Sequence, residues 1–409
     1  MRLTSVLGRI YQRTPGGLRR LAGRASSALP PAVEERLAAW AAHRPYVAPP
    51  PPVDVPDARV RLYVAPANYA GQGYAWARAV ERHLGGVGAR NMAPLGGFGF
   101  QADQHVPGHV YRTSRSWQRA ERAAVEKFTH VIVEAQLPLF PRLSRGGTAD
   151  EVARLRAAGV SVATLSHGSE VRLPSAHARR EEHSPFRGAY GDAAVLESVA
   201  TSNLARLREL RDRGVPAFVS TPDLLLDVPW ATWLPVCVDT STWAVEAAPM
   251  VRRVPVVVHA PSRGSLKGTD LVEPVLRELD ESGMIEYRQA KGLDRAGMQE
   301  LYRRADVVLD QFALGSYGVA ACEAMAAGRV VVSHVSDQVR DEVRRSTGTD
   351  LPVVQAEAGS LRAVLLRLLD DRDAARDAAS RGPELVRRLH DGRAAAAALA
   401  PFLGVDPPS

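Results

Sequence analysis

Two short apolar runs, separated by a loop and a helical pattern, constrain this chain more than any other feature. They lie in the stretch ADVVLDQFALGSYGVAACEAMAAGRVVVSHV, residues 305–335. The runs over 306–310 and 330–333 are typical of buried parallel strands, and the pattern over 318–327 predicts a helix that ends at Gly328. A strand, a helix and a second strand in this order predict a βαβ unit of a parallel sheet. The chain is therefore expected to be an α/β protein.

The predicted helix carries a single acid. Its residues are apolar or small on every side except at Glu323. Burying a carboxylate costs free energy unless something hydrogen-bonds it. In open parallel sheets, ligands bind outside the carboxyl ends of the strands, where such a helix begins. Glu323 is therefore a candidate to bind the hydroxyl groups of a ligand.

The same alternation continues through most of the chain, as in doubly wound α/β domains. An irregular connection over 221–243, with three prolines and three tryptophans, separates two such series. A chain of 409 residues, 45% of them apolar, is long enough for two domains with their own cores. We predict strands at 61–65, 129–134, 160–165, 215–220, 254–259, 285–289, 306–310, 330–333 and 352–355, and helices at 74–84, 116–127, 149–158, 203–213, 294–304, 318–327, 337–345, 361–380 and 384–399.

Positive charge is concentrated at the start of the chain. Residues 1–44 hold eight arginines and two glutamates, a net +6 of the total +7, which leaves the rest of the chain at +1. A nearly neutral body argues against a nucleic-acid partner, because such proteins carry basic surfaces. The basicity is therefore a property of the N-terminal arm.

The arm has a helical pattern. One face would carry apolar side chains, with arginines off that face; these are Leu3, Val6, Leu7, Ile10 and Tyr11. Basic amphipathic segments of this kind lie in the interface of anionic membranes. An unstructured arginine-rich tail and a helix packed on its own body are the open alternatives. The proline-rich stretch 45–56 is expected to hold the arm away from the body, because polyproline geometry rises about 3.1 Å per residue.

The two cysteines, Cys237 and Cys322, do not make a disulfide framework, which fits a reducing compartment. No apolar run reaches the roughly eighteen residues of a membrane span. Cys322 is a candidate nucleophile beside Glu323, but a packed helix without a nearby base favours a structural thiol. His177 and His183 lack the spacing or partners of a metal site, so we expect no metal.

The stretch GSYGVAACEAMAAGRVVV, residues 315–332, resembles the donor-sugar signature of GT-B glycosyltransferases, especially the retaining enzymes of glycosyltransferase family 4. Four more stretches resemble a branch of that family: PANYAGQGYAWARA, HGSEVR, STPDLLLDVPWATWLPVCVD and HAPSRGSLKGTD. The resemblance runs from about residue 60 to about residue 380, and the motifs are more specific in this order than singly. It implies a GT-B fold, in which two Rossmann-like, doubly wound parallel-sheet domains face a cleft. Its parts would be a basic arm and linker at 1–56, an acceptor-side domain at 57–245, a donor-side domain at 246–383, and a C-terminal helix at 384–409 that packs back on the first domain.

The resemblance also implies roles for residues of the donor-side domain. Glu323 would hold the ribose of a nucleotide-sugar, and the helix start at Gly318 and Val319 would face its diphosphate. Arg263 and Lys267 would offset the charge that develops on the diphosphate as the glycosidic bond breaks.

One position departs from the family. Family 4 enzymes usually carry two glutamates with seven residues between them; the second matches Glu323, and the first touches the transferred sugar. Gly315 stands at the first position here. Asp310, Gln311 or Tyr317 would then supply the missing contacts, and Asp310 is the catalytic candidate because it ends a predicted strand. A second interpretation is that Asp310 caps a turn.

Two segments of the first domain are candidates for the other side of the cleft. Gly71, Gln72 and Gly73 follow the first predicted strand, where glycines let backbone N–H groups approach a phosphate or a sugar; packing alone is the alternative. His167 follows another strand and would donate to a sugar hydroxyl or a phosphate oxygen, which makes it the second catalytic candidate. A histidine that caps local backbone is the alternative there.

The resemblance implies a retaining, metal-independent, hexosyltransferase-like enzyme. It would move a sugar from a nucleotide-diphosphate sugar to a hydroxyl of a glycan, a lipid-linked acceptor or a cell-surface polysaccharide precursor. By resemblance, the leaving phosphate accepts the acceptor's proton, so no nucleophile or cofactor is needed. A non-catalytic GT-B-like subunit that binds nucleotide-sugar, for which Gly315 argues, and a nucleotide-sugar epimerase are the alternatives. The expected location is the cytoplasm, peripheral at the inner face of the plasma membrane through residues 1–24.

Overall fold

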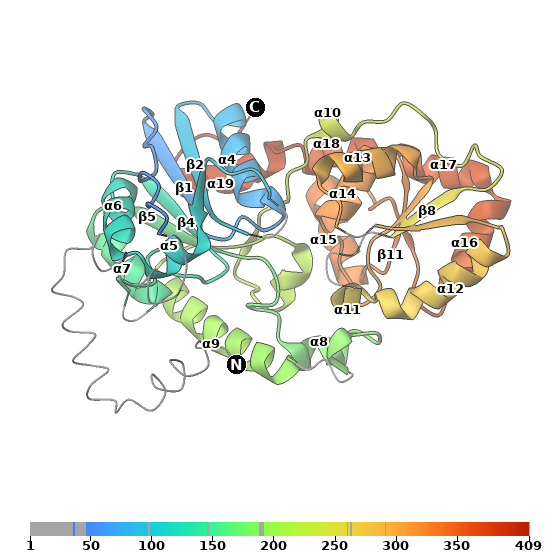
Figure 1. The fold of residues 1–409 in the computed structure, drawn as a ribbon, viewed down its shortest axis with the longest axis horizontal. Helices are drawn as coiled ribbons and strands as arrows, with labels where there is room; N and C mark the ends of the chain where they lie inside the picture. The colour runs from blue at the N-terminus through green and yellow to red at the C-terminus, as the bar shows by residue number, and fades with distance from the viewer. Residues whose placement is uncertain are drawn as a thin grey trace.

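The structure is a computed structural model that describes residues 36, 46–96, 99–144, 147–187, 192–259, 261, 264–290 and 292–408. The amphipathic pattern of residues 3–11 and the candidate Arg263 lie outside the described residues. The described chain forms two lobes side by side (Figure 1), each built around one parallel sheet. No helix in the described part of the chain is long and apolar enough to cross a bilayer.

The first sheet has seven parallel strands in the order β3-β2-β1-β4-β5-β6-β7. The order reverses between β1 and β4, and ligands bind at such switch points, outside the carboxyl ends of the strands. Apolar side chains cover both faces of the sheet and form two separate core clusters. The strands are β1 (Val60–Ala65), β2 (Val87–Leu95), β3 (Gln104–Pro107), β4 (His130–Glu134), β5 (Ser161–Ser166), β6 (Ala217–Val219) and β7 (Thr232–Trp233).

Helices cover this sheet and extend beyond it. The main ones are α4 (Gln72–His83), α5 (Gly108–Thr113), α6 (Arg115–Val125), α7 (Thr148–Ala157), α8 (Pro174–Arg180) and α9 (Ala193–Asp212). Strand β2 was not among the predicted strands, because Arg90 and Asn91 interrupt its apolar run. Both side chains find a partner in the structure: Arg90 lies 3.4 Å from Glu81, and the Asn91 amide nitrogen donates to the Val64 carbonyl at 2.9 Å.

The second sheet has five parallel strands in the order β12-β11-β10-β8-β9. The strands are β8 (Val256–His259), β9 (Glu286–Gln289), β10 (Val307–Leu309), β11 (Val330–Ser333) and β12 (Val353–Gln355). Its order reverses between β8 and β10, which places a second switch point at their carboxyl ends. The helices around it are α11 (Gly264–Lys267), α12 (Thr269–Glu281), α13 (Arg295–Arg304), α14 (Val319–Ala326), α15 (Asp337–Thr347), α16 (Leu361–Asp370) and α17 (Arg372–Ser380).

The C-terminal segment connects the lobes. The helix predicted over 384–399 is divided into α18 (Gly382–Leu389) and α19 (Arg393–Leu403), because Gly392 adopts φ 104°, a backbone conformation that ends a right-handed helix. Helix α18 packs against α14 in the second lobe, and α19 packs against α4 in the first (Figure 1).

The proline-rich stretch packs on the first lobe, in contrast to the spacer predicted for it. Val53 is 5% exposed, and its N–H donates to the buried carboxylate of Glu121 at 2.9 Å. Pro56 lies so close to Gly88 that a Cβ on this glycine would be 2.7 Å from the Pro56 Cβ. The second half of the stretch therefore belongs to the folded body, because Val53 finds a buried site there.

Candidate functional site

Glu323 lies on α14 at the carboxyl edge of the second sheet, with a partly exposed side chain among buried neighbours. Its carboxylate has no hydrogen-bond partner among the residues that the structure describes, although three charged groups act on it. Burial raises the pKa of Glu323 to about 8, the positive charges of Arg295 and Lys267 oppose this rise, and Asp310 adds to it. A carboxyl group this costly and without a protein partner is suited to bind a ligand.

The start of α14 carries a second cluster. Lys267, at the end of α11, donates from Nζ to Oδ1 of Asp310 at 2.6 Å, and Oδ2 of Asp310 accepts from the Gly318 N–H at 3.3 Å. Asp310 is 2% exposed. It therefore makes the turn-capping contact of its second interpretation and holds Lys267 beside the start of α14. Among the described residues no side chain accepts from the Val319 N–H in the first turn of α14, so this N–H remains available to an anion.

Tyr317 and Gln72 lie in the core instead of lining a cleft. Tyr317 is 3% exposed, and its hydroxyl lies 3.2 Å from Nε2 of His390. Gln72 exchanges two hydrogen bonds with the backbone of Cys237, at 3.0 and 2.6 Å. Both side chains are thus used to join segments of the fold, which the sequence motif alone does not reveal.

Cys322 is fully buried, and burial raises the pKa of its thiol well above the ordinary value. A protonated, enclosed thiol is a poor nucleophile. The structure therefore supports the structural interpretation of this cysteine.

The first lobe contributes a carboxylate–histidine pair. Nε2 of His167 lies 3.2 Å from Oε1 of Glu134, whose side chain is fully buried. The other oxygen of Glu134 accepts from the N–H groups of Ala67 and Asn68, each at 3.0 Å. The His167 ring stacks on Trp76, with ring centroids 5.8 Å apart. Glu134 thus orients His167, and its own charge is balanced by backbone donors.

Sequence reasoning did not identify Glu134 as a site residue. Its only signal is an acid at the end of an apolar run, because β4 ends at Glu134. Its partner His167 follows β5, the neighbouring strand, so the pair forms only when the two strands align.

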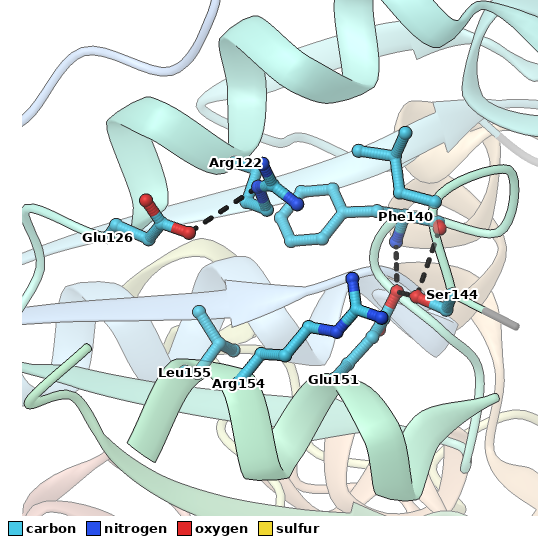
Figure 2. Close-up of a pocket in the computed structure, with 8 residues that line it drawn as sticks. Arg122, Glu126, Phe140, Ser144, Glu151, Arg154 and Leu155 are labelled. Atoms are coloured by element: carbon cyan, nitrogen blue, oxygen red, sulfur yellow. Dashed lines mark hydrogen bonds and ion pairs between the residues drawn. The ribbon is translucent and has the colours of Figure 1, made fainter. Parts of the chain in front are cut away.

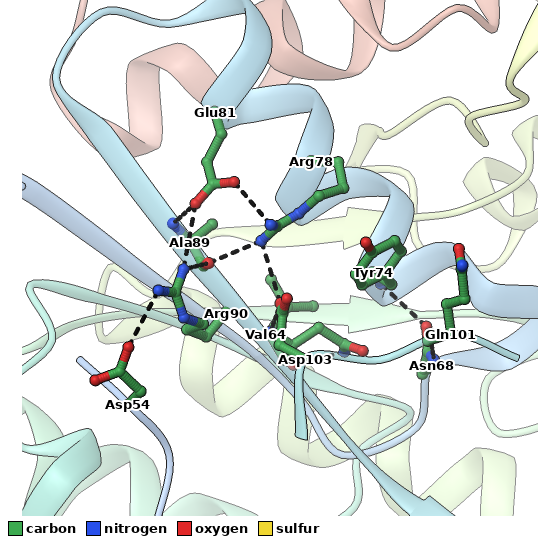
Figure 3. Close-up of polar contacts among 11 residues, drawn as sticks. Asp54, Val64, Asn68, Tyr74, Arg78, Glu81, Ala89, Arg90, Gln101 and Asp103 are labelled. Atoms are coloured by element: carbon green, nitrogen blue, oxygen red, sulfur yellow. Dashed lines mark hydrogen bonds and ion pairs between the residues drawn. The ribbon is translucent and has the colours of Figure 1, made fainter. Parts of the chain in front are cut away.

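The glycine loop after β1 is held in shape by Asn68. Three of its residues adopt left-handed backbone: Asn68 at φ 48°, Ala70 at φ 52° and Gly71 at φ 74°. The Asn68 side chain accepts from the Tyr74 N–H at 3.0 Å and donates to the Gln101 carbonyl at 2.8 Å (Figure 3).

Gly73 allows a close approach of α4 to the pair. A Cβ at Gly73 would lie 2.5 Å from Nδ2 of Asn91 and 3.2 Å from both carboxylate oxygens of Glu134. The packing explanation therefore holds for Gly73, and this packing brings α4 against the residue that orients His167.

Gly315 lies against the first lobe. It adopts φ 65°, and a Cβ there would meet the carboxylate of Glu181, which follows α8. No side chain of the second lobe replaces the missing acid at this position among the described residues, since Gln311 donates to the Ser316 carbonyl and accepts from the Leu314 N–H.

The histidines of the stretch 175–187 have different surroundings. His177 contacts the Ser184 hydroxyl at 2.8 Å and is buried. His183 lies with Glu182 and Glu357 in a group whose ligand atoms are within 4.8 Å of one another. The two acids near His183 thus come from both lobes, Glu182 from the first and Glu357 from the second. Both acids are exposed, and no member of the group is buried.

Two cavities lie away from these residues. Figure 2 shows a cavity of about 10 Å³, too small for a substrate, beside the buried carboxylate of Glu151. Glu151 accepts from the N–H groups of Leu139 and Phe140 and from the Ser144 hydroxyl, so its role is structural. A cavity of about 640 Å³ lies beside α15 and α18, at the amino edge of β12, and neither Lys267 nor Glu323 lines it.

Comparison with solved structures found similar folds. A sucrose-phosphate synthase from Thermosynechococcus elongatus aligns at a TM-score of 0.53 with 13% identity, over 83% of this chain and 96% of that one. HepE from Anabaena, in complex with UDP and glucose, aligns at 0.52 with 10% identity, over 84% and 99%. A glycosyltransferase from Rickettsia africae aligns at 0.50 with 11% identity, over 85% and 98%. No family model matches the chain, and no curated protein matches its sequence. The two Rossmann-like lobes and these alignments show that the chain has the GT-B fold, as its sequence predicted.

Proposed function

We propose that the protein is a glycosyltransferase that moves a sugar from a nucleotide-diphosphate sugar to a hydroxyl group. The observation that carries this proposal is Glu323. It is a costly carboxyl group at the carboxyl edge of the second sheet, and no described residue hydrogen-bonds it. Ribose hydroxyls are suitable donors to such a group. HepE, which has the same fold, was solved with UDP and glucose, and this supports a nucleotide-sugar as the ligand.

The diphosphate would bind at the start of α14. The Val319 N–H and the ammonium of Lys267 lie there, and a diphosphate would compete with Asp310 for Lys267 and for the Gly318 N–H. Such donors stabilise the charge that develops on the diphosphate as the bond to the sugar breaks. We assign Arg263 the same role on the strength of its motif.

His167 would face the sugar and the acceptor, together with the loop at Gly71. Glu134 fixes the ring through one nitrogen, so the other nitrogen is left for a hydroxyl or a phosphate oxygen. In the proposed reaction the bond from the anomeric carbon to the diphosphate breaks, and a bond to the acceptor oxygen forms. The acceptor's proton passes to the departing diphosphate. We expect the reaction to retain the anomeric configuration and to need no metal. The anomeric signal in the proton NMR spectrum of the product tests the configuration, and activity in the presence of EDTA tests the metal independence.

We further propose an acceptor on the cytoplasmic side of the plasma membrane, a glycan or lipid-linked precursor of a cell-surface polysaccharide. The basic, amphipathic pattern of residues 1–24 supports this part of the proposal, because such segments bind anionic lipid.

A thermal-shift panel tests the proposal. The panel contains UDP, GDP, ADP and TDP and their glucose derivatives, because a ligand of the folded state raises the melting temperature with its occupancy. At least one nucleotide-sugar should raise the melting temperature of the wild type. Lys267→Ala should weaken this ligand about tenfold or more, since a hydrogen bond from a charged group is lost. Lys127→Ala, which changes an exposed lysine of the first lobe, is the matched control.

Lys267→Ala also leaves buried Asp310 unpaired, which lowers stability. The double variant Lys267→Met with Asp310→Asn removes both charges and separates binding from folding. A wild type that responds to none of the eight ligands would refute the proposed function.

A further inference from the structure

The end of α8 carries an acid of the first lobe into the second lobe. Oε2 of Glu181 lies 2.7 Å from Nε2 of His334, the residue that follows β11. One turn earlier, Nε2 of His177 lies 3.3 Å from the Leu314 carbonyl. Figure 1 shows α8 reaching below the second lobe. The contact therefore lies at the carboxyl edge of the second sheet, next to the loop that joins β10 to α14.

Glu181 fills the place of a side chain on Gly315. A Cβ at Gly315 would lie 2.3 Å from Oε1 and 2.6 Å from Cδ of Glu181, distances at which the two cannot coexist. Gly315 also adopts φ 65°, which favours glycine. The absence of a side chain at 315 is thus the condition for Glu181 to reach this loop.

The surroundings of Glu181 keep it ionised and leave one oxygen available. Oε1 of Gln355 accepts from the Val335 N–H at 3.0 Å and from Arg340 at 2.9 Å, so the amide nitrogen of Gln355 donates to His334 Nδ1 at 3.1 Å. His334 then carries its proton on Nε2 and donates to Glu181. This hydrogen bond lowers the pKa of Glu181.

The second oxygen of Glu181, Oε1, faces Gly315 and has no partner in the described part of the chain. The side chains of Glu181 and His334 are 13% and 14% exposed. An ionised, nearly buried oxygen accepts strong hydrogen bonds from hydroxyl groups. It lies against Gly315, on the loop between β10 and α14 that also carries Asp310 and Gly318, where the proposed function places the diphosphate.

We propose that Glu181 supplies, from the first lobe, the carboxylate that binds hydroxyl groups of the transferred sugar, at the position where Gly315 provides none. This inference rests on the proposed function. It assigns the donor a sugar with free hydroxyl groups at this point, and it makes recognition of the sugar dependent on both lobes. It also removes the main argument for a non-catalytic subunit, because a carboxylate from the first lobe lies beside Gly315, where the motif lacks its first acid.

Calorimetry on the whole chain tests the assignment. The probes are UDP and UDP-glucose, GDP and GDP-glucose, ADP and ADP-glucose, and TDP and TDP-glucose, and the pair that binds the wild type is used. Glu181→Gln keeps the shape of the side chain and removes its charge. We expect the affinity for the nucleotide-sugar to fall about tenfold, while the affinity for the nucleoside diphosphate stays unchanged.

A merely structural contact between the lobes predicts another result. In that case Glu181→Gln would weaken the diphosphate and the nucleotide-sugar equally, and this outcome, or no change in either, overturns the assignment. Glu182→Gln, which alters the exposed neighbouring acid, is the control and should change neither affinity. Failure of every pair to bind the wild type overturns the proposed function and the assignment with it. Selective loss without a change in melting temperature supports Glu181 as a sugar ligand.

Discussion

Glu323 makes the stability of the free protein depend on pH. Its folded pKa of about 8 lies above its ordinary value of 4.5, so the folded state binds more protons than the unfolded state between these values. The free energy of unfolding should therefore fall as pH rises from about 4.5 to about 8, by at most about 1.4 kcal/mol per pH unit. Glu323→Gln removes this term. In urea titrations at pH 5, 6.5 and 8, the variant should gain stability over the wild type as pH rises, and a constant difference would contradict this.

The affinity for ligand should depend on the ionisation of Glu323 as well, but it should rise with pH where the stability of the free protein falls. Ribose hydroxyls that donate to Glu323 favour its ionised form, so the affinity of the wild type for nucleotide-sugar should increase between pH 6 and pH 8. Glu323→Ala should lose about tenfold or more in affinity and lose this increase. Unchanged calorimetric affinity in the variant would exclude the ribose role.

The sequence identified a site residue only where the residues around it in the chain pointed to its role. Glu323 stood out because it is the one acid on an apolar helix, and Lys267 because its stretch, HAPSRGSLKGTD, resembles a family motif. Glu134 and Glu181 were missed because their partners, His167 and His334, come from other strands or from the other lobe. Tyr317 was misplaced for the same reason, since its partner His390 belongs to the C-terminal segment.

At the scale of elements, the approach of α4 to β4 depends on Gly73. Gly73→Ala should lower the free energy of unfolding by about 1–3 kcal/mol, as overpacking does, because both Asn91 and Glu134 are held by buried hydrogen bonds and cannot move freely. This cost exceeds the gain of about 1 kcal/mol that alanine brings to a helix. Transfer activity should fall as well, because Glu134 orients His167. Thermal unfolding and initial rates measure the two effects.

Gly85→Ala is the matched control for this element. Gly85 follows α4, and a Cβ there would meet nothing within 4 Å. It should leave both stability and activity near the wild type. If Gly73→Ala is as stable as Gly85→Ala, α4 does not depend on this contact.

Elements with apolar runs were predictable, and elements built on polar contacts were not. The βαβ unit over 305–335 appears as β10, α14 and β11, because its strands are buried on both faces. The C-terminal helix was predicted as one element, but Gly392 divides it. A helical period continues across such a break, so the pattern alone does not locate it.

At the scale of the molecule, the lobes are joined by more than the connection over 221–243. One hydrophobic cluster runs from Leu204 and Val219 in the first lobe to Val256 and Val331 in the second. Together with the C-terminal segment, this cluster fixes the two carboxyl edges relative to each other, so residues from both lobes meet at the site. That arrangement follows from the complete fold, and only the resemblance to a known family indicated it beforehand.

The N-terminal residues offer the last prediction, at this same scale. Two truncations distinguish the predicted membrane-binding role of the arm from the structural role of the residues that follow it. Deletion of residues 1–45 should leave the melting temperature unchanged and abolish flotation with anionic liposomes, because the basic residues are removed. Deletion of residues 1–56 should in addition cost about 2–4 kcal/mol, since it removes buried Val53 and the hydrogen bond that Val53 donates to Glu121.

Neutral liposomes are the control for charge, and full-length protein should not float with them. If the protein without residues 1–45 floats with anionic liposomes as the full chain does, the membrane contact lies on the body and not on the arm. If the two truncations unfold at the same temperature, the packing of Val53 does not contribute to stability. The two measurements are independent, because residues 1–24 carry the charge and residues 46–56 carry the contacts with the first lobe.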